Sequence, residues 1–389
     1  MKRFYLTLTF TVIYFTGNTQ IFTQSKAEKA LQTYRDNLSI LRKEHTNGRN
    51  LPLVNFFFFG MGDRLKMVYR DGVLYNAKTS KALRRWKVKT ALIVPSEYLV
   101  HLELENGKAV DIQEDTQGVY VYENNMQVIM AESRLGLPSF EGKKYASVLK
   151  VLHHEILMNV DEGLPLPNFL VYQKTNYRAA AMMTMVLKQT NNLNLISNWV
   201  VNLKEPYNRS IEGSPEIDNL GEVLYIVSMV SDSKHPLIEK ILEEADGYKN
   251  NDYIEGKTED SFHPVYQTKW IKFGLKSLGI SDNYKIPLIY DNYSPVFWLD
   301  FKTQNVGGRQ FDEVTSLNSP YLTWAEDHTF NQKRAMVSLS DYPLSWESDS
   351  KSANYLGMNI VDQTYTQSRL CATHGWHAAE MFLLLMELK

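Results

Sequence analysis

Cysteine is almost absent from the chain, which has one such residue, Cys371, among 389. A single thiol excludes any internal disulfide, so the fold depends on its hydrophobic core. Long apolar runs are also scarce. The apolar stretch at residues 4–15 follows Lys2 and Arg3 and is too short to span a bilayer. We therefore predict a signal peptide over residues 1–24, no transmembrane segment, and an exported protein that is periplasmic or secreted.

A surplus of positive charge is missing too, because 42 Lys and Arg face 44 Asp and Glu. Nucleic acid requires a basic face, so we expect no such partner. The chain has no G-x-S-x-G elbow, and Gly60 and Gly62 lack the third glycine of a dinucleotide site. Adjacent His153 and His154 point about 100° apart on a helix and do not chelate one ion. We expect neither a cofactor nor a metal.

The order of hydrophobic patterns predicts three regions after the signal. Residues 25–50 have a helical period and form an N-terminal helix. Residues 51–138 are β-rich, with hairpin turns at Asp71-Gly72, Asn106-Gly107 and Asn124-Asn125. Residues 139–389 contain candidate helices at 143–158, 176–190, 217–232, 236–246, 264–278, 320–332 and 377–388. Long polar loops join them, which favours a mainly α fold, an α/α toroid of six-hairpin type with an N-terminal β-rich segment.

Aromatic residues make up 12% of the chain, and six of the seven Trp lie in the helical part. Indole rings stack on the flat C–H faces of sugars, and acids bond the sugar hydroxyls. We therefore expect some of these Trp to line a carbohydrate cleft, the others being core residues. The candidates with acids or His nearby include Trp324, Trp346 and Trp376.

Charged residues at helix starts are the best candidates for chemistry. Arg178 lies at a helix N-terminus, where a cation is disfavoured unless it is paired or faces a substrate. Asp218 enters an apolar helix, as either an N-cap or a site residue. Glu380 opens another apolar helix, as a capping residue or as a base. Glu255 and Asp260 lie together in one loop. The same segments supply Tyr177, His263, Trp270 and His377 as candidate substrate contacts.

Four of these segments resemble glucoamylase-type α/α-toroid glycoside hydrolases. Tyr-Arg-Ala-Ala at residues 177–180 is similar to the family's sugar-binding Tyr/Pro-Arg-Asp-Ala, with Ala179 in place of Asp. Residues 216–221 match Gln-x-Asp-x-x-Gly with Glu for Gln. Ile-Glu at 254–255, before Tyr-Gln-Thr-Lys-Trp at 266–270, is similar to the stretch with the general acid. Residues 376–380 have the spacing of Trp-x-x-Ala-Glu, which carries the base.

The resemblance implies inverting hydrolysis of an oligosaccharide or polysaccharide fragment in an exo mode, in which the terminal sugar is released first. Glu255 protonates the leaving oxygen, Glu380 activates a water, and Asp260 is the reserve acid. Tyr177, Arg178 and Asp218 then bind the sugar. The β-rich segment either roofs the cleft or mediates formation of a homodimer.

Two other function classes fit the same residues. A polysaccharide lyase would use Tyr177, Arg178, His263 and Tyr266, and a toroid hydrolase of unsaturated uronides would use Asp218 as its acid. A non-catalytic glycan-binding protein would keep the Trp residues without needing Glu255 and Glu380.

Overall fold

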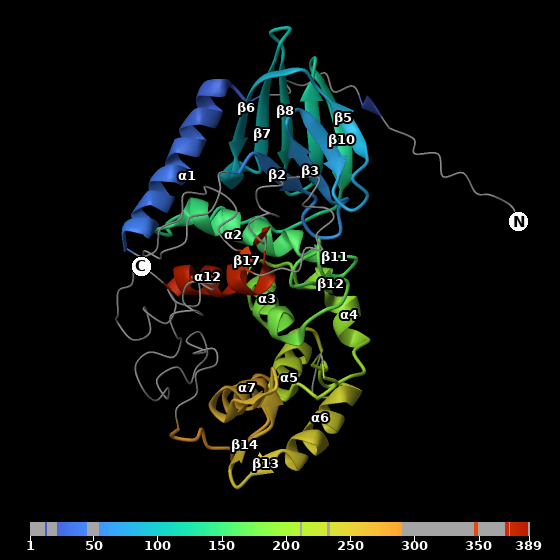
Figure 1. The fold of residues 1–389 in the computed structure, drawn as a ribbon, viewed down its shortest axis with the longest axis vertical. Coiled ribbons are helices and arrows are strands. Elements are labelled where there is room, and N and C mark those ends of the chain that lie inside the picture. Colours follow the sequence, from blue (N-terminus) through green and yellow to red (C-terminus); the bar gives the residue numbers. More distant parts are fainter. Residues whose placement is uncertain are drawn as a thin grey trace, which may run out of the picture.

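The computed structural model describes residues 12–13, 22–44, 54–210, 212–231, 234–289, 346–348, 370–372 and 374–387. A β-rich part lies at one end of an elongated molecule, and a row of helices extends from it to the other end (Figure 1). None of the helices in these ranges has both the length and the apolar run that a membrane crossing needs. Most of the predicted signal peptide lies outside the described residues.

Two antiparallel sheets form the β-rich part. The larger sheet has the order β1-β10-β9-β8-β7-β6 and the smaller has the order β2-β3-β4-β5. The strands of the larger sheet are β1 (Val12–Ile13), β6 (Val88–Val94), β7 (Leu99–Leu104), β8 (Ala109–Glu114), β9 (Gly118–Glu123) and β10 (Met126–Glu132). Those of the smaller sheet are β2 (Phe56–Phe59), β3 (Met67–Arg70), β4 (Val73–Asn76) and β5 (Ala82–Arg85).

The three predicted hairpin turns are confirmed as the connections β3–β4, β7–β8 and β9–β10. Asp71 and Gly72 have φ of 46° and 78°, and Asn124 and Asn125 have φ of 53° and 60°. Both pairs have the positive φ that a type I′ turn requires at its two central residues, where Asn, Asp and Gly meet the least steric resistance. Local turn chemistry therefore sets the register of these strands.

The helices confirm most of the predicted helical segments to within a few residues. They are α1 (Gln24–Glu44), α2 (Ala146–Met158), α3 (Tyr177–Gln189), α4 (Ser197–Val201), α5 (Asn219–Val230), α6 (Pro236–Gly247), α7 (Pro264–Ser277) and α12 (Gly375–Glu387). Short hairpins lie between them: β11 (Val160–Asp161) with β12 (Leu164–Pro165), β13 (Lys249–Asn250) with β14 (Tyr253–Ile254), and β15 (Lys257–Thr258) with β16 (Ser261–Phe262). The predicted helix at 320–332 lies outside the described residues, and α4 was not predicted.

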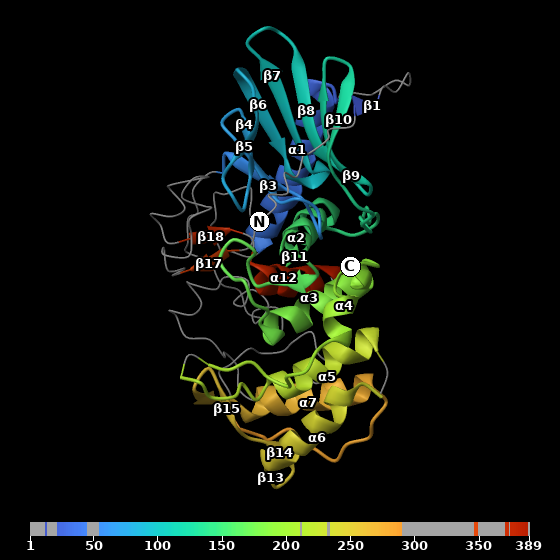
Figure 2. The ribbon, with the colours of Figure 1, turned by 90° about the vertical axis from the view of Figure 1, so that its right-hand side faces the viewer.

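The expected mainly α, α/α-toroid fold is wrong. Strands account for most of residues 56–132, and the described helices pack in the row α1–α2–α12–α3–α5–α7 (Figures 1 and 2). The helix α12 lies between α2 and α3 instead of extending the row beyond α7. Helical periodicity identifies each apolar face, but it does not specify which other helix covers that face.

Close backbone packing joins α5 to α7. A Cβ atom on Gly221 would lie 2.2 Å from the carbonyl carbon of Trp270, and one on Gly274 would lie 2.5 Å from the oxygen of Gly221. Only glycine permits that approach at both positions. The contact fixes the start of α5 against the middle of α7, and the start of α5 carries the acidic segment described below.

The loop from Gly60 to Lys66 joins the β-rich part to the helices. Arg64 pairs with buried Glu114 of β8 at 2.9 Å. Lys66 is buried, and its Nζ donates to the carbonyl oxygens of Gly60, Gly62 and Val160 at 2.6, 2.6 and 2.7 Å. Because Val160 belongs to β11, the lysine links the loop to the helical part of the molecule.

Candidate functional site

A cleft of about 760 Å³ opens beside the N-termini of α3 and α12. Its walls come from those two helix starts, from the loops before α3 and α5, and from the turn of the β15–β16 hairpin. The aromatic side chains that line it are Tyr172, Tyr177, Tyr207 and Trp376, and the charged ones are Lys174, Arg178, Glu205, Arg209 and Glu259. The cleft thus combines flat apolar surfaces with ionic groups.

Two asparagines hold the first turn of α3 in place. Asn176 is the N-cap residue, and its Oδ1 accepts a hydrogen bond from the backbone N–H of Ala179 at 3.2 Å. Asn208 comes from the loop before α5, and its Oδ1 accepts from the backbone N–H of Tyr177 at 2.8 Å. The hydroxyl of Tyr177 donates to the carbonyl oxygen of Glu205 at 2.9 Å. The two loops are therefore tied to the helix start that carries Arg178.

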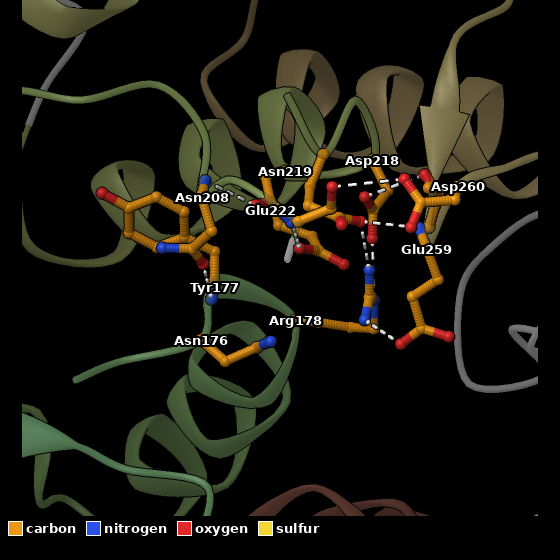
Figure 3. A network of polar contacts seen from close by, with 12 residues as sticks. Asn176, Tyr177, Arg178, Asn208, Asp218, Asn219, Glu222, Glu259 and Asp260 are labelled. Atoms are coloured by element: carbon orange, nitrogen blue, oxygen red, sulfur yellow. Dashed lines mark hydrogen bonds and ion pairs between the residues drawn. The ribbon is translucent and has the colours of Figure 1, made fainter. Parts of the chain in front are cut away.

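Arg178 binds three carboxylates at once (Figure 3). Its Nε, Nη1 and Nη2 lie 2.8, 2.9 and 3.2 Å from oxygens of Asp218, Glu259 and Glu216. The arginine is only 3% exposed, and its guanidinium carbon lies 5.7 Å from the ring centroid of Trp376. A planar guanidinium suits this task, since it presents several donors in fixed directions and stacks on an aromatic face.

Glu259 is the carboxylate of this cluster that lines the cleft. Its side chain is 58% exposed, whereas that of Glu216 is 11% exposed and that of Asp218 is fully buried. Glu259 and Asp260 form the hairpin turn, with φ of 48° and 62°. Non-glycine residues pay roughly 1–2 kcal/mol each for that conformation. The backbone N–H of Glu259 donates to Glu216 at 2.9 Å, which helps to hold the strained turn in place.

A second buried acid, Glu222, lies behind the cluster. Its oxygens accept hydrogen bonds from Asn219 Nδ2 at 2.8 Å and from the hydroxyl of Tyr266 at 3.2 Å. Burial raises the pKa of Glu222 well above its usual value, and the nearby charge of Asp218 raises it further. Burial also raises the pKa of Glu216. The α5 start thus holds carboxyls that resist ionisation next to an arginine that attracts negative charge.

His374 forms the wall of the cleft next to Trp376. Burial lowers the pKa of His374 to about 4, so its ring is neutral at pH 7. Its Nδ1 accepts from the backbone N–H of His377 at 3.4 Å, which places the ring proton on Nε2. The two rings lie 4.4 Å apart. The N–H of the intervening Gly375 donates to Pro167 at 2.7 Å and anchors α12 to the loop before α3.

The structure brings together four of the substrate contacts predicted from the sequence. Tyr177, Arg178 and Trp376 line the cleft, and Asp218 bonds to Arg178 from behind. Asp218 Oδ1 also accepts from Thr258 at 3.0 Å. The ion pairs of Arg178 with Asp218, Glu216 and Glu259 explain why this arginine lies at a helix N-terminus, where a cation is otherwise disfavoured.

None of the three predicted catalytic acids lines the cleft. Glu255 follows the β13–β14 hairpin and accepts a hydrogen bond from Asn250 at 2.6 Å. Glu380 is fully buried in the body of α12. Asp260 is exposed on the turn beside Glu259 and accepts from Ser210 at 3.2 Å. Their catalytic roles stay predictions.

The remaining predicted contacts are scattered. Trp270 is completely buried and packs against Tyr225 and Phe273. His263 is the buried N-cap residue of α7. His377 contacts His374 without lining the cleft. Trp324 lies outside the described residues, and for Trp346 only the backbone is described, where β17 (Trp346–Ser348) pairs with β18 (Leu370–Ala372).

Sequence reasoning missed Glu259, Asn208 and Tyr207. Nothing in the sequence around Glu259 indicates a function, because its position results from a hairpin with strands of only two residues. Asn208 and Tyr207 belong to a loop without regular structure.

Comparison of the chain with models of protein families, with curated proteins and with solved structures finds no match in any of the three. Within the described ranges, no group of three or more His, Cys, Asp or Glu side chains is arranged to hold a metal ion.

Proposed function

We propose that the protein is a glycoside hydrolase that binds an oligosaccharide in the cleft beside Arg178. The observation that carries the proposal is the position of Glu259. Its carboxylate is fixed by Arg178 at 2.9 Å, stands on a strained turn, and is exposed to a cleft with four aromatic walls. Backbone strain that places an acid in a cleft is typical of functional sites.

The lining of the cleft supports a sugar ligand. Tyr and Trp rings offer flat surfaces for the C–H faces of sugar rings, and the arginine, asparagine and carboxylate groups offer planar donors and acceptors for hydroxyls. A volume of about 760 Å³ lies within the range of small-molecule sites and is large enough for a short oligosaccharide.

Glu259 suits the role of a general base. Its Oε1 accepts from Arg178, while Oε2 accepts no hydrogen bond from the described residues and remains open to the cleft. In the proposed step, a water attacks the anomeric carbon and passes a proton to Oε2, while a second acid protonates the departing glycosidic oxygen. Of the predicted acids, Asp260 is the candidate for that second role, because it stands beside Glu259 on the same turn.

The test is E259Q, assayed on a panel of oligosaccharides for product release and for binding. Glutamine keeps the shape and accepts the Arg178 bond but is not a base, so we expect kcat to fall at least about 100-fold with Kd nearly unchanged. E239Q is the matched control, because Glu239 is exposed on α6 and does not line the cleft. D260N examines the acid beside Glu259 as the candidate general acid. E255Q and E380Q examine the other predicted acids in the same assay.

Full activity of E259Q would overturn the assignment of the base. A wild-type protein that binds an oligosaccharide but releases no product from any member of the panel would contradict hydrolysis altogether. That outcome favours a glycan-binding protein.

A further inference from the structure

The amide groups of Asn176 and Asn208 are oriented by the backbone. Each Oδ1 accepts from an N–H of the first turn of α3, and a backbone N–H can only donate. The amide orientation is therefore fixed in both residues, and each Nδ2 is left as a donor. Neither Nδ2 has an acceptor among the described residues, and both asparagines line the cleft. The loops that build the cleft thus present hydrogen-bond donors.

Two cations on the same loops add to this donor surface. Lys174 and Arg209 line the cleft, and neither has a carboxylate within ion-pair distance in the part of the chain that the structure describes. Arg209 lies over the ring of Tyr207 at 5.5 Å and donates to the carbonyl oxygen of Gly213 at 2.9 Å. Asn176 lies two residues after Lys174, and Asn208 directly precedes Arg209, so each cation adjoins one of the donor amides.

The acids of the cleft, in contrast, already have partners. Glu205 lies 3.4 Å from Lys240, and Glu259 lies 2.9 Å from Arg178. A ligand that enters the cleft therefore meets two cations that have no carboxylate partner among the described residues, and carboxylates that are already paired with cations. Hydrogen bonds to an ionised acceptor such as a carboxylate are stronger than those to a neutral acceptor such as a sugar hydroxyl.

We propose that the cleft selects acidic sugars, and that the carboxylate of a uronic acid residue binds between Lys174, Arg209 and the amides of Asn176 and Asn208. This inference rests on the proposed function and names its substrate class. The four donors would discriminate against a neutral sugar because they would lose their water without gaining an ionised acceptor.

The test uses trisaccharides of galacturonate, mannuronate and glucuronate, each paired with its methyl ester. Binding of both members of each pair to the full chain is measured by calorimetry at low salt. We expect at least one acid to bind about tenfold tighter than its ester, with the difference shrinking at high salt.

N176D and N208D separate recognition from folding. Aspartate keeps the oxygen that caps α3 but replaces the donor amide with a negative acceptor. Both variants should weaken binding of the acid about tenfold or more while leaving the ester nearly unaffected. N106D is the matched control, because Asn106 Oδ1 likewise accepts a backbone N–H, from Lys108 at 3.1 Å, in the distant β7–β8 turn.

Each outcome has a distinct meaning. If esters bind as tightly as acids, or if N176D and N208D keep the preference for the acid, the acidic-sugar inference is overturned while the proposed hydrolase stands. If none of the six probes binds but neutral oligosaccharides are cleaved, this inference alone fails. If no oligosaccharide of any kind binds, the proposed function fails as well.

Discussion

Two buried cations differ in the charge of their hydrogen-bond acceptors. One is Lys66, in the loop from Gly60 to Lys66 that joins the β-rich part to the helices (the junction loop), and the other is Arg178 at the cleft. Lys66 is 1% exposed and Arg178 is 3% exposed. Lys66 donates to three neutral carbonyl oxygens, whereas Arg178 binds three carboxylates. The lysine is buried against carbonyl groups of its own loop and of β11, and the arginine lines an open cleft.

The hydrogen bonds of Lys66 indicate which protonation state this buried side chain has. Burial lowers the pKa of Lys66 to about 7, since the ammonium group loses its water. Three carbonyl acceptors nevertheless need three N–H donors, and only the charged form supplies them. We therefore regard Lys66 as an ammonium group whose hydrogen bonds replace water and fix the junction.

Arg178, in contrast, lies in a cluster with excess negative charge. Three carboxylates around one guanidinium exceed its charge, so the cluster does not neutralise itself. Burial, and after it the neighbouring negative charge, raises the pKa of Glu216 and raises that of Glu222 more strongly. A proton-transfer site requires carboxyl groups with a shifted pKa next to the cleft that holds the substrate. The comparison teaches that burial alone does not distinguish a cation that holds the fold together from one that lines a cleft.

The largest expected effect is that of R178M. Removing one partner of a buried ion cluster leaves Asp218 uncompensated, so we expect a loss of about 4 kcal/mol in the free energy of unfolding, measured with urea. Glycan binding should be lost too. R209M is the control, because Arg209 lines the same cleft but is exposed and should change stability by less than about 1 kcal/mol. Equal stability of the two variants would break the comparison.

K66M should cost less, about 2 kcal/mol, because it leaves neutral carbonyls instead of charges without a partner. Binding of glycans should survive in the folded fraction, in contrast to R178M. Urea unfolding and calorimetry measure both quantities, and K81M provides an exposed control. Loss of binding without loss of stability would show that the junction lysine has a role in the cleft.

The smallest effect is expected from E222Q at pH 5, where stability should change by less than about 1 kcal/mol. The folded state binds the proton of Glu222 more tightly than the unfolded chain, since its pKa is raised from the usual 4.5. The free energy of unfolding therefore falls as the pH rises from 4.5 through the folded-state pKa.

Glutamine has no such proton to lose. E222Q should accordingly gain stability relative to the wild type when unfolding is compared at pH 5 and pH 8. E239Q, on the exposed face of α6, should show no such drift. A parallel pH dependence in wild type and E222Q would mean that Glu222 does not titrate in this range.

Local features of the fold could be predicted from the sequence, and long-range ones could not. The turn residues at Asp71-Gly72 and Asn124-Asn125 are sufficient to specify their hairpins, and apolar periodicity located α2, α3, α5, α6, α7 and α12. The toroid was wrong because nothing in a helix's own sequence shows that α12 packs between α2 and α3.

The candidate site divides in the same way. Arg178 was predicted because a cation at a helix start violates an electrostatic preference that is visible in the sequence. Glu259 was not, because it meets Arg178 only after residues 81 positions apart are brought together. Glu255 and Glu380 were chosen from short motifs, and in the case of Glu380 also from its place at the start of an apolar helix. Neither signal reports which carboxylates share a cleft.

The position of α12 has a consequence for how the chain is made. Its neighbours α2 and α3 end at Met158 and Gln189, and α12 begins only at Gly375. During synthesis, the apolar faces of α2 and α3 leave the ribosome long before the helix that covers them. Assembly of this layer is therefore a late and slow event. Until then the nascent protein exposes a surface that chaperones recognise, and we expect its yield in cells to depend on them.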